Sequence, residues 1–157
     1  MLETSTSLEQ LVREIVGEFE GERAPLLEIL HAIQLRRGHV DSPTVRLVAE
    51  ALNLSRADVH GVVTFYRDFT AKPRGATVVR VCRAEACASV GAADLVDSLE
   101  DTFGVRMGET TRDGSLTLDE VFCLGNCALG PAVQVDERLY GRVDHERVVA
   151  LVAESAS

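Results

Sequence analysis

The sequence predicts an α+β protein, in which an N-terminal helical bundle is followed by a domain built on one β-sheet. Three observations lead to this prediction. Apolar residues recur at helical spacing up to about residue 69, and short Val-rich or alternating segments follow from residue 76 onward. The segment AKPRGA at residues 71–76, with a proline, a glycine and two charges, separates the two patterns. We therefore expect a helical domain at residues 1–73 and a second domain at residues 74–157.

Two helices are expected before residue 40. Ser7 and Gln10 have the spacing of a capping box, so the first helix should begin at Ser7 and continue along an apolar face. The second helix should begin near Pro25, because proline is favoured in the first helical turn, and it should stop at Gly38.

Two further helices are expected before the linker. Ser42 is a favourable N-cap and Pro43 then occupies the first helical position of the third helix, which should end near Asn53. Ser55 should cap the fourth helix, which runs through HGVVTFYRDF at residues 60–69. The apolar side chains of that segment are numerous enough to serve both the core and a docking surface.

The second domain is expected to follow the order β-α-β-β-β-α on a single sheet. Its strands are predicted at residues 76–82, 105–110, 115–123, 132–136 and 138–143, and its helices at residues 91–104 and 144–154. Asp113-Gly114 supplies a turn before the third strand, and Asp144 is a suitable cap for the last helix. A short polar turn joins the last two strands into a hairpin.

Composition and charge exclude several classes of protein. The net charge of −9 argues against nucleic-acid binding, which requires a basic face. No apolar run approaches the roughly 20 residues that cross a bilayer. The N-terminus is acidic and polar, unlike a signal peptide. We therefore expect a cytoplasmic protein that does not span a membrane, and in a reducing compartment structural disulfides are rare.

The four cysteines form two pairs, a C-x4-C pair at Cys82 and Cys87 and a C-x3-C pair at Cys123 and Cys127. Four interpretations of this spacing are open: isolated core cysteines, two disulfides, a structural zinc site, or an iron–sulfur cluster. Pairing at two strand ends disfavours isolated core residues, and zinc sites usually use tighter C-x2-C turns. Ferredoxin-type clusters take four thiolates and accept wider loops such as C-x4-C. The spacing therefore indicates a metal site and favours iron–sulfur over zinc.

The residues around the cysteines suit a cluster that the backbone must approach closely. The small residues in the two loops are Ala84, Ala86, Ala88 and Gly125. Gly130-Pro131 ends the second loop before the next strand. No nearby side chain is an obvious catalytic group. The histidines are scattered without the spacing of metal ligands: His31, His39, His60 and His145.

Two long segments resemble the thioredoxin-like [2Fe–2S] ferredoxin family. They are VCRAEACASVGA at residues 81–92 and GETTRDGSLTLDEVFCLGNCALGPAVQVDERLYGRV at residues 108–143. The family includes the 24-kDa subunit of respiratory complex I and its relatives in NAD-reducing hydrogenases and formate dehydrogenases. The resemblance implies that the second domain is thioredoxin-like and carries one [2Fe–2S] cluster. The ligands that it implies are Cys82, Cys87, Cys123 and Cys127.

Shorter segments are most similar to the gamma subunit of NAD-dependent, molybdenum-containing formate dehydrogenases. These are RAEAC at residues 83–87, HGVVTFYRDF at residues 60–69 and CLGNCALGP at residues 123–131. The resemblance implies an electron-transfer subunit without catalytic residues of its own. It would dock on a flavoprotein that binds FMN and NAD(H), and through it on a molybdenum- and iron–sulfur-containing subunit. The alternatives are the equivalent subunit of complex I or of an NAD-reducing hydrogenase and, more remotely, a structural-zinc adaptor.

Two charged residues beside the first pair have opposite expected effects. Arg83 adjoins a predicted ligand, and its positive charge would raise the reduction potential of a nearby cluster if it pointed inward. Glu85 would lower that potential in the same position. For both residues, an exposed and solvated side chain is the alternative.

Overall fold

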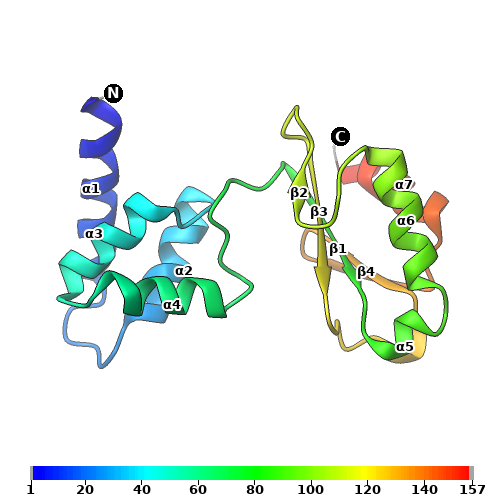
Figure 1. Cartoon of the computed structure of the whole chain (residues 1–157), viewed down its shortest axis with the longest axis horizontal. Helices are drawn as coiled ribbons and strands as arrows, with labels where there is room; N and C mark the ends of the chain where they lie inside the picture. The colour runs from blue at the N-terminus through cyan, green and yellow to red at the C-terminus, as the bar shows by residue number, and fades with distance from the viewer. Residues whose placement is uncertain (1, 156–157) are drawn as a thin grey trace. The chain divides into compact units, whose positions relative to one another are not determined.

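The computed structural model describes residues 2–155, with side chains described from residue 7 (Figure 1). The chain divides into two compact units, Met1–Pro73 and Arg74–Ser157. Each unit has its own buried apolar cluster, so we describe them separately. None of the helices in the described residues is both long enough and apolar enough to cross a bilayer.

The first unit is helical. Its helices are α1 (Leu2–Glu18), α2 (Leu26–Arg37), α3 (Ser42–Leu52) and α4 (Arg56–Phe65). α1 packs on α2 and α3, and α4 packs on α3 and α2. Their inner faces share one core, which includes Ile15, Ile29, Ile33, Val48 and Val59. The expected Gly38 stop is confirmed, because this glycine caps α2 with a left-handed φ of 85°.

Two of the predicted helix starts are wrong. α1 begins at Leu2, so Ser7 lies inside the helix, where serine carries only a modest propensity cost. α3 is capped by Asp41 and not by Ser42, because the Asp41 carboxylate accepts a hydrogen bond from the Thr44 N–H at 3.1 Å. The Arg37 guanidinium binds the same carboxylate and holds the pKa of Asp41 well below its usual value.

The fourth helix is shorter than expected. Ser55 caps it by accepting from the Asp58 N–H at 3.1 Å, as predicted. The helix stops at Phe65, and the chain is extended at Tyr66. Phe69 turns back into the core, where its ring lies 4.8 Å from that of His31, whereas Phe65 and Tyr66 remain exposed. The segment at residues 60–69 is therefore divided between core and surface.

The second unit contains a five-stranded sheet in the order β2-β3-β1-β4-β5. The strands are β1 (Thr77–Cys82), β2 (Glu109–Thr110), β3 (Leu116–Val121), β4 (Ala132–Val135) and β5 (Arg138–Gly141). β1 and β3 are parallel, and the other pairs are antiparallel. The predicted hairpin is confirmed as β4 and β5.

Two helices, α6 (Ala92–Phe103) and α7 (His145–Ser155), cover one face of this sheet. They contact each other and both contact β1. Leu99, Leu118, Val133 and Leu151 are among the buried residues between the layers. The predicted cap is confirmed, because the Asp144 carboxylate accepts from the Arg147 N–H at 2.8 Å. This helix-covered mixed sheet agrees with the expected thioredoxin-like α+β fold.

Three local predictions need correction. The strand expected at residues 105–110 is reduced to Glu109–Thr110, because Gly108 has a left-handed φ of 84° that interrupts extended structure. β3 ends at Val121 instead of continuing to Cys123. A four-residue helix, α5 (Glu85–Ala88), was not predicted, since one turn is too short to show a periodic pattern.

Candidate metal centre

The parallel pairing of β1 and β3 brings the two cysteine segments to one end of the sheet. Cys82 is the last residue of β1 and lies opposite Val121, the last residue of β3. Cys123 follows β3 by two residues. Cys87 lies in α5, and Cys127 begins the short 3-10 helix η1 (Cys127–Leu129) before β4. Because parallel strands end on the same side, the sheet brings the two cysteine segments together.

The sulfur atoms form two neighbouring pairs. The Cys82 thiol interacts with Cys87 and raises its pKa, and the Cys123 thiol does the same to Cys127. Cys127 is also close enough to interact electrostatically with Cys82 and Cys87. None of the four thiols is in a disulfide. Within residues 2–155, no group of three or more His, Cys, Asp or Glu side chains is arranged to hold a single metal ion.

This donor set fits a [2Fe–2S] cluster. Such a cluster has two irons, and two thiolate pairs at neighbouring positions match one pair for each iron. A structural zinc would instead require all four sulfurs around one point. Burial, together with the adjacent Cys82 thiol, raises the pKa of Cys87, and the adjacent Cys123 thiol raises the pKa of Cys127. Bound metal would hold all four sulfurs as thiolates.

The two pairs differ in exposure. Cys82 and Cys87 are each 1% exposed and pack with Ala92 and Ala132. Cys123 and Cys127 are exposed. The centre is therefore buried on the side of the first pair and open to solvent on the side of the second pair.

Backbone groups also face the sulfur atoms. The Gly125 N–H donates to Cys123 Sγ at 3.3 Å, and Gly125 has a left-handed φ of 75° that allows this turn. The Ala132 N–H forms a hydrogen bond with the Cys87 sulfur, which lowers its pKa and partly opposes the effect of burial. A Cβ atom added at Gly130 would lie 3.4 Å from Cys87 Sγ. The expected close approach is therefore present at Gly125, and Gly130 adds one that the sequence did not predict.

Of the two charged residues near the first pair, Arg83 is ion-paired and Glu85 is exposed. The Arg83 guanidinium forms an ion pair with Glu120 at 3.3 Å. Glu85 is exposed. Sequence reasoning missed Glu120 as the partner of Arg83, because no local pattern reveals which residue of β3 lies beside β1.

Three exposed apolar side chains lie in or beside the cysteine loops, namely Val90, Phe122 and Leu129, and we call them the apolar rim. Phe122 precedes Cys123, and Leu129 ends η1. A Cβ atom at Gly130 would lie 2.9 Å from Val90 Cγ2, so Val90 contacts the second loop from the α5 side. This apolar rim beside the open side of the centre has the character of a protein-docking surface.

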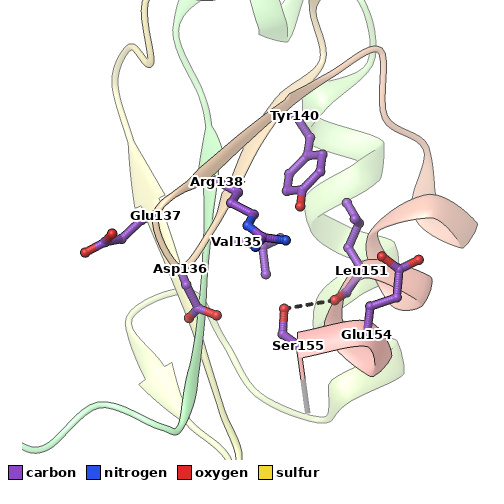
Figure 2. Close-up of a pocket in the computed structure, with 8 residues that line it drawn as sticks. All are labelled: Val135, Asp136, Glu137, Arg138, Tyr140, Leu151, Glu154 and Ser155. Atoms are coloured by element: carbon purple, nitrogen blue, oxygen red, sulfur yellow. Dashed lines mark hydrogen bonds between the residues drawn. The ribbon is translucent and has the colours of Figure 1, made fainter. Parts of the chain in front are cut away.

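A surface hollow of about 580 Å³ lies between the β4–β5 hairpin and the end of α7 (Figure 2). Tyr140 and Leu151 point into it, and Glu137 points away. The Ser155 hydroxyl donates to the Leu151 carbonyl at 3.1 Å. None of the four cysteines lines this hollow, so it does not contribute to the candidate centre.

Comparison with known proteins gives a consistent result. Residues 12–156 match the family model of the thioredoxin-like [2Fe–2S] ferredoxins. An NADH-quinone oxidoreductase subunit of Buchnera aphidicola is 35% identical over 134 residues, which cover 85% of this chain and 83% of the relative. The corresponding NADH-quinone oxidoreductase subunit of Escherichia coli K12 is 31% identical over 150 residues, covering 96% of this chain and 90% of the relative.

A hydrogenase subunit is about as similar. NADP-reducing hydrogenase subunit HndA of Solidesulfovibrio fructosivorans is 34% identical over 147 residues, covering 92% of this chain and 86% of the relative. Among solved structures, an air-oxidised NAD⁺-reducing [NiFe]-hydrogenase aligns with a TM-score of 0.68 at 23% identity. The alignment covers 83% of this chain but 22% of the hydrogenase chain, and at that identity it supports the fold alone.

Proposed function

The chain belongs to the thioredoxin-like [2Fe–2S] ferredoxin family, and we propose that it is the electron-transfer subunit of an NAD(P)-linked oxidoreductase complex. The proposed ligands of its one cluster are Cys82, Cys87, Cys123 and Cys127. The observation that carries the proposal is the meeting of two thiol pairs at the joint end of two parallel strands.

Each part of the centre has a separate role in this proposal. When bound, the cluster supplies one-electron redox chemistry. Cys82 and Cys87 hold its buried side, where the apolar surroundings exclude water. The Gly125 and Ala132 N–H groups place positive dipoles against the ligand sulfurs and offset part of their negative charge. The exposed side at Cys123 and Cys127 leaves a short path for an electron to a docked partner.

We assign the two-electron chemistry to a partner flavoprotein. NADH gives up two electrons as a hydride, so a flavin must stand between it and a one-electron carrier. The sequence contains no G-x-G-x-x-G dinucleotide loop. The relatives named above are subunits of an NADH-quinone oxidoreductase and an NADP-reducing hydrogenase, which supports the same arrangement here. FMN and NAD(H) would then bind to the partner, and the apolar rim Val90, Phe122 and Leu129 would face it.

Within this class we propose the NAD-dependent molybdenum formate dehydrogenase as the host complex, on the resemblance of residues 60–69, 83–87 and 123–131 to its gamma subunit. Complex I and an NAD-reducing hydrogenase are the alternatives. Anaerobic affinity purification from native cells tests the choice. Copurification of a molybdenum-containing subunit supports formate dehydrogenase, whereas a nickel–iron subunit or quinone-linked membrane subunits would replace it with one of the alternatives.

Anaerobic isolation of the chain tests the wider proposal. We expect two irons and two acid-labile sulfides per chain, visible absorption that bleaches with dithionite, and an EPR signal from the reduced protein. NADH alone should leave the absorption unchanged. A chain that holds one zinc and no sulfide, or that NADH bleaches without a flavin, would overturn the proposal.

A further inference from the structure

The loop that carries the second cysteine pair is fastened to the end of β5. The Arg142 N–H donates to the Leu129 carbonyl at 2.7 Å, and the Val143 N–H donates to the Pro131 carbonyl at 3.2 Å. Gly141, the last residue of β5, pairs with Ala132 at the start of β4. Residues 129–132, just after the second cysteine pair, therefore contact residues 141–143 at the end of the β4–β5 hairpin.

Gly141 lies where this contact leaves no room for a side chain. A Cβ atom added at Gly141 would lie 2.7 Å from each of three atoms, namely Asn126 Nδ2, Leu129 Cβ and the Leu129 carbonyl oxygen. Such distances are far below van der Waals contact, so the loop would have to shift. The φ angle of Gly141 is not in the left-handed region, so glycine is required here for space and not for backbone conformation.

The two residues that Gly141 touches enclose Cys127. The Leu129 N–H donates to the Asn126 carbonyl at 3.0 Å and closes the turn that contains Cys127. A displacement of Asn126 and Leu129 would therefore also move Cys127. Cys82 and Cys87 would stay in place, because they are packed among buried apolar residues. The contact with Gly141 therefore bears on the position of Cys127 and not on that of the buried pair.

We propose that Gly141 and Asn126 form a steric pair that positions Cys127 for metal binding, an inference that depends on the ligand assignment proposed above. The Asn126 amide fills, together with the Leu129 Cβ atom and carbonyl oxygen, the space that a side chain at position 141 would occupy. The pair acts through Cys127 of the same chain, so its effect should appear in the isolated chain.

Gly141→Ala tests the proposal, with Gly75→Ala as a matched control. A Cβ atom at Gly75 would lie 2.6 Å from the Leu116 backbone, an equally severe clash at the start of β3, away from the cysteines. Both variants should be less stable than the wild type. Gly141→Ala alone should change the EPR g-values of the dithionite-reduced protein, and it should lose iron to a chelator about 10-fold faster.

Asn126→Ala decides whether the amide is the obstructing group. In the Gly141→Ala/Asn126→Ala double variant, g-values and iron loss should return part of the way to those of the wild type. The double variant also tests the proposal if Gly141→Ala does not fold. A double variant that folds and binds a cluster supports the pairing, and one that also does not fold overturns it. Wild-type g-values and iron retention in folded Gly141→Ala would also overturn it, and the cluster assignment would stand. A wild-type chain without a cluster would instead refute the proposed function.

Discussion

The two cysteine segments reach the same end of the second unit by different means. The first segment is regular structure, because Cys82 ends a central strand and Cys87 lies in a helical turn, both in the apolar interior. The second segment is an exposed loop between two strands, held by the Gly125 turn and by hydrogen bonds from the end of β5. The core packing that stabilises the unit therefore places the first pair, whereas local contacts place the second.

Because the two segments are held in place differently, substitutions in them should affect folding stability and metal binding to different extents. A change at the first pair alters buried packing, so stability and cluster binding should fall together. A change in the second segment should affect the cluster while leaving the sheet and its helices nearly intact. Comparing matched substitutions in the two segments therefore distinguishes the two kinds of support.

Serine in place of each cysteine should give the largest effects. All four variants should lose the wild-type EPR signal and most of the bound iron, because a serine oxygen is a harder and poorer ligand. Cys82→Ser and Cys87→Ser also place a hydroxyl in a buried apolar site, which should cost the metal-free chain about 1–3 kcal/mol. Cys123→Ser and Cys127→Ser are at exposed sites and should change that stability by about 0.5 kcal/mol or less.

Iron and sulfide analysis, EPR and urea unfolding of the metal-free variants measure these effects. A variant that keeps the wild-type signal would remove that cysteine from the ligand set. Equal loss of stability in all four metal-free chains would contradict the division between a buried and an exposed pair.

The elements that sequence predicts well are those set by local pattern. The helix from Ala92 to Phe103 and the hairpin of β4 and β5 follow from periodicity and turn residues. The four cysteines stand out as candidate ligands for the same reason, since their spacing is visible along the chain. Convergence of the two pairs additionally requires that β1 and β3 be parallel neighbours.

The features that sequence could not predict depend on contacts between distant residues. Glu120 lies beside Val81 only because of the register between β1 and β3, so its ion pair with Arg83 has no local signal. The requirement for glycine at position 141 depends in the same way on how the second loop packs against β5. The wrong cap at Ser42 is a different case, because Asp41 is an equally good cap and Arg37 decides between them.

An intermediate effect is expected from Gly125→Ala, which tests the exposed segment without removing a ligand. An added Cβ atom at Gly125 would meet nothing within 4 Å, so the cost comes from its left-handed φ of 75°. That strain is about 1–2 kcal/mol and should distort the turn that aims the Gly125 N–H at Cys123. Gly61→Ala is the control, since it lies inside α4 with free space and should stabilise the chain by about 0.5–1 kcal/mol.

Cluster retention after chelator treatment distinguishes the two glycine variants. Gly125→Ala should lose iron faster than the wild type, and Gly61→Ala should not. If both variants retained iron equally well, the turn at Gly125 would not be needed to hold the exposed pair.

The smallest effect should come from the ion pair beside the buried segment. Arg83 and Glu120 lie 3.3 Å apart and are partly exposed, so solvent screens their charges and their joint effect on a nearby centre is small. Arg83→Ala removes a positive charge from beside Cys82 and should lower the reduction potential. Glu120→Gln leaves the positive charge of Arg83 and should raise it, and the double variant should lie between the two. EPR-monitored redox titration measures the shifts, with Glu146→Gln on α7 as a control for a charge change outside the pair. Because the argument requires opposite signs, a shift of both single variants in the same direction would show that Glu120 does not balance Arg83 at the cluster.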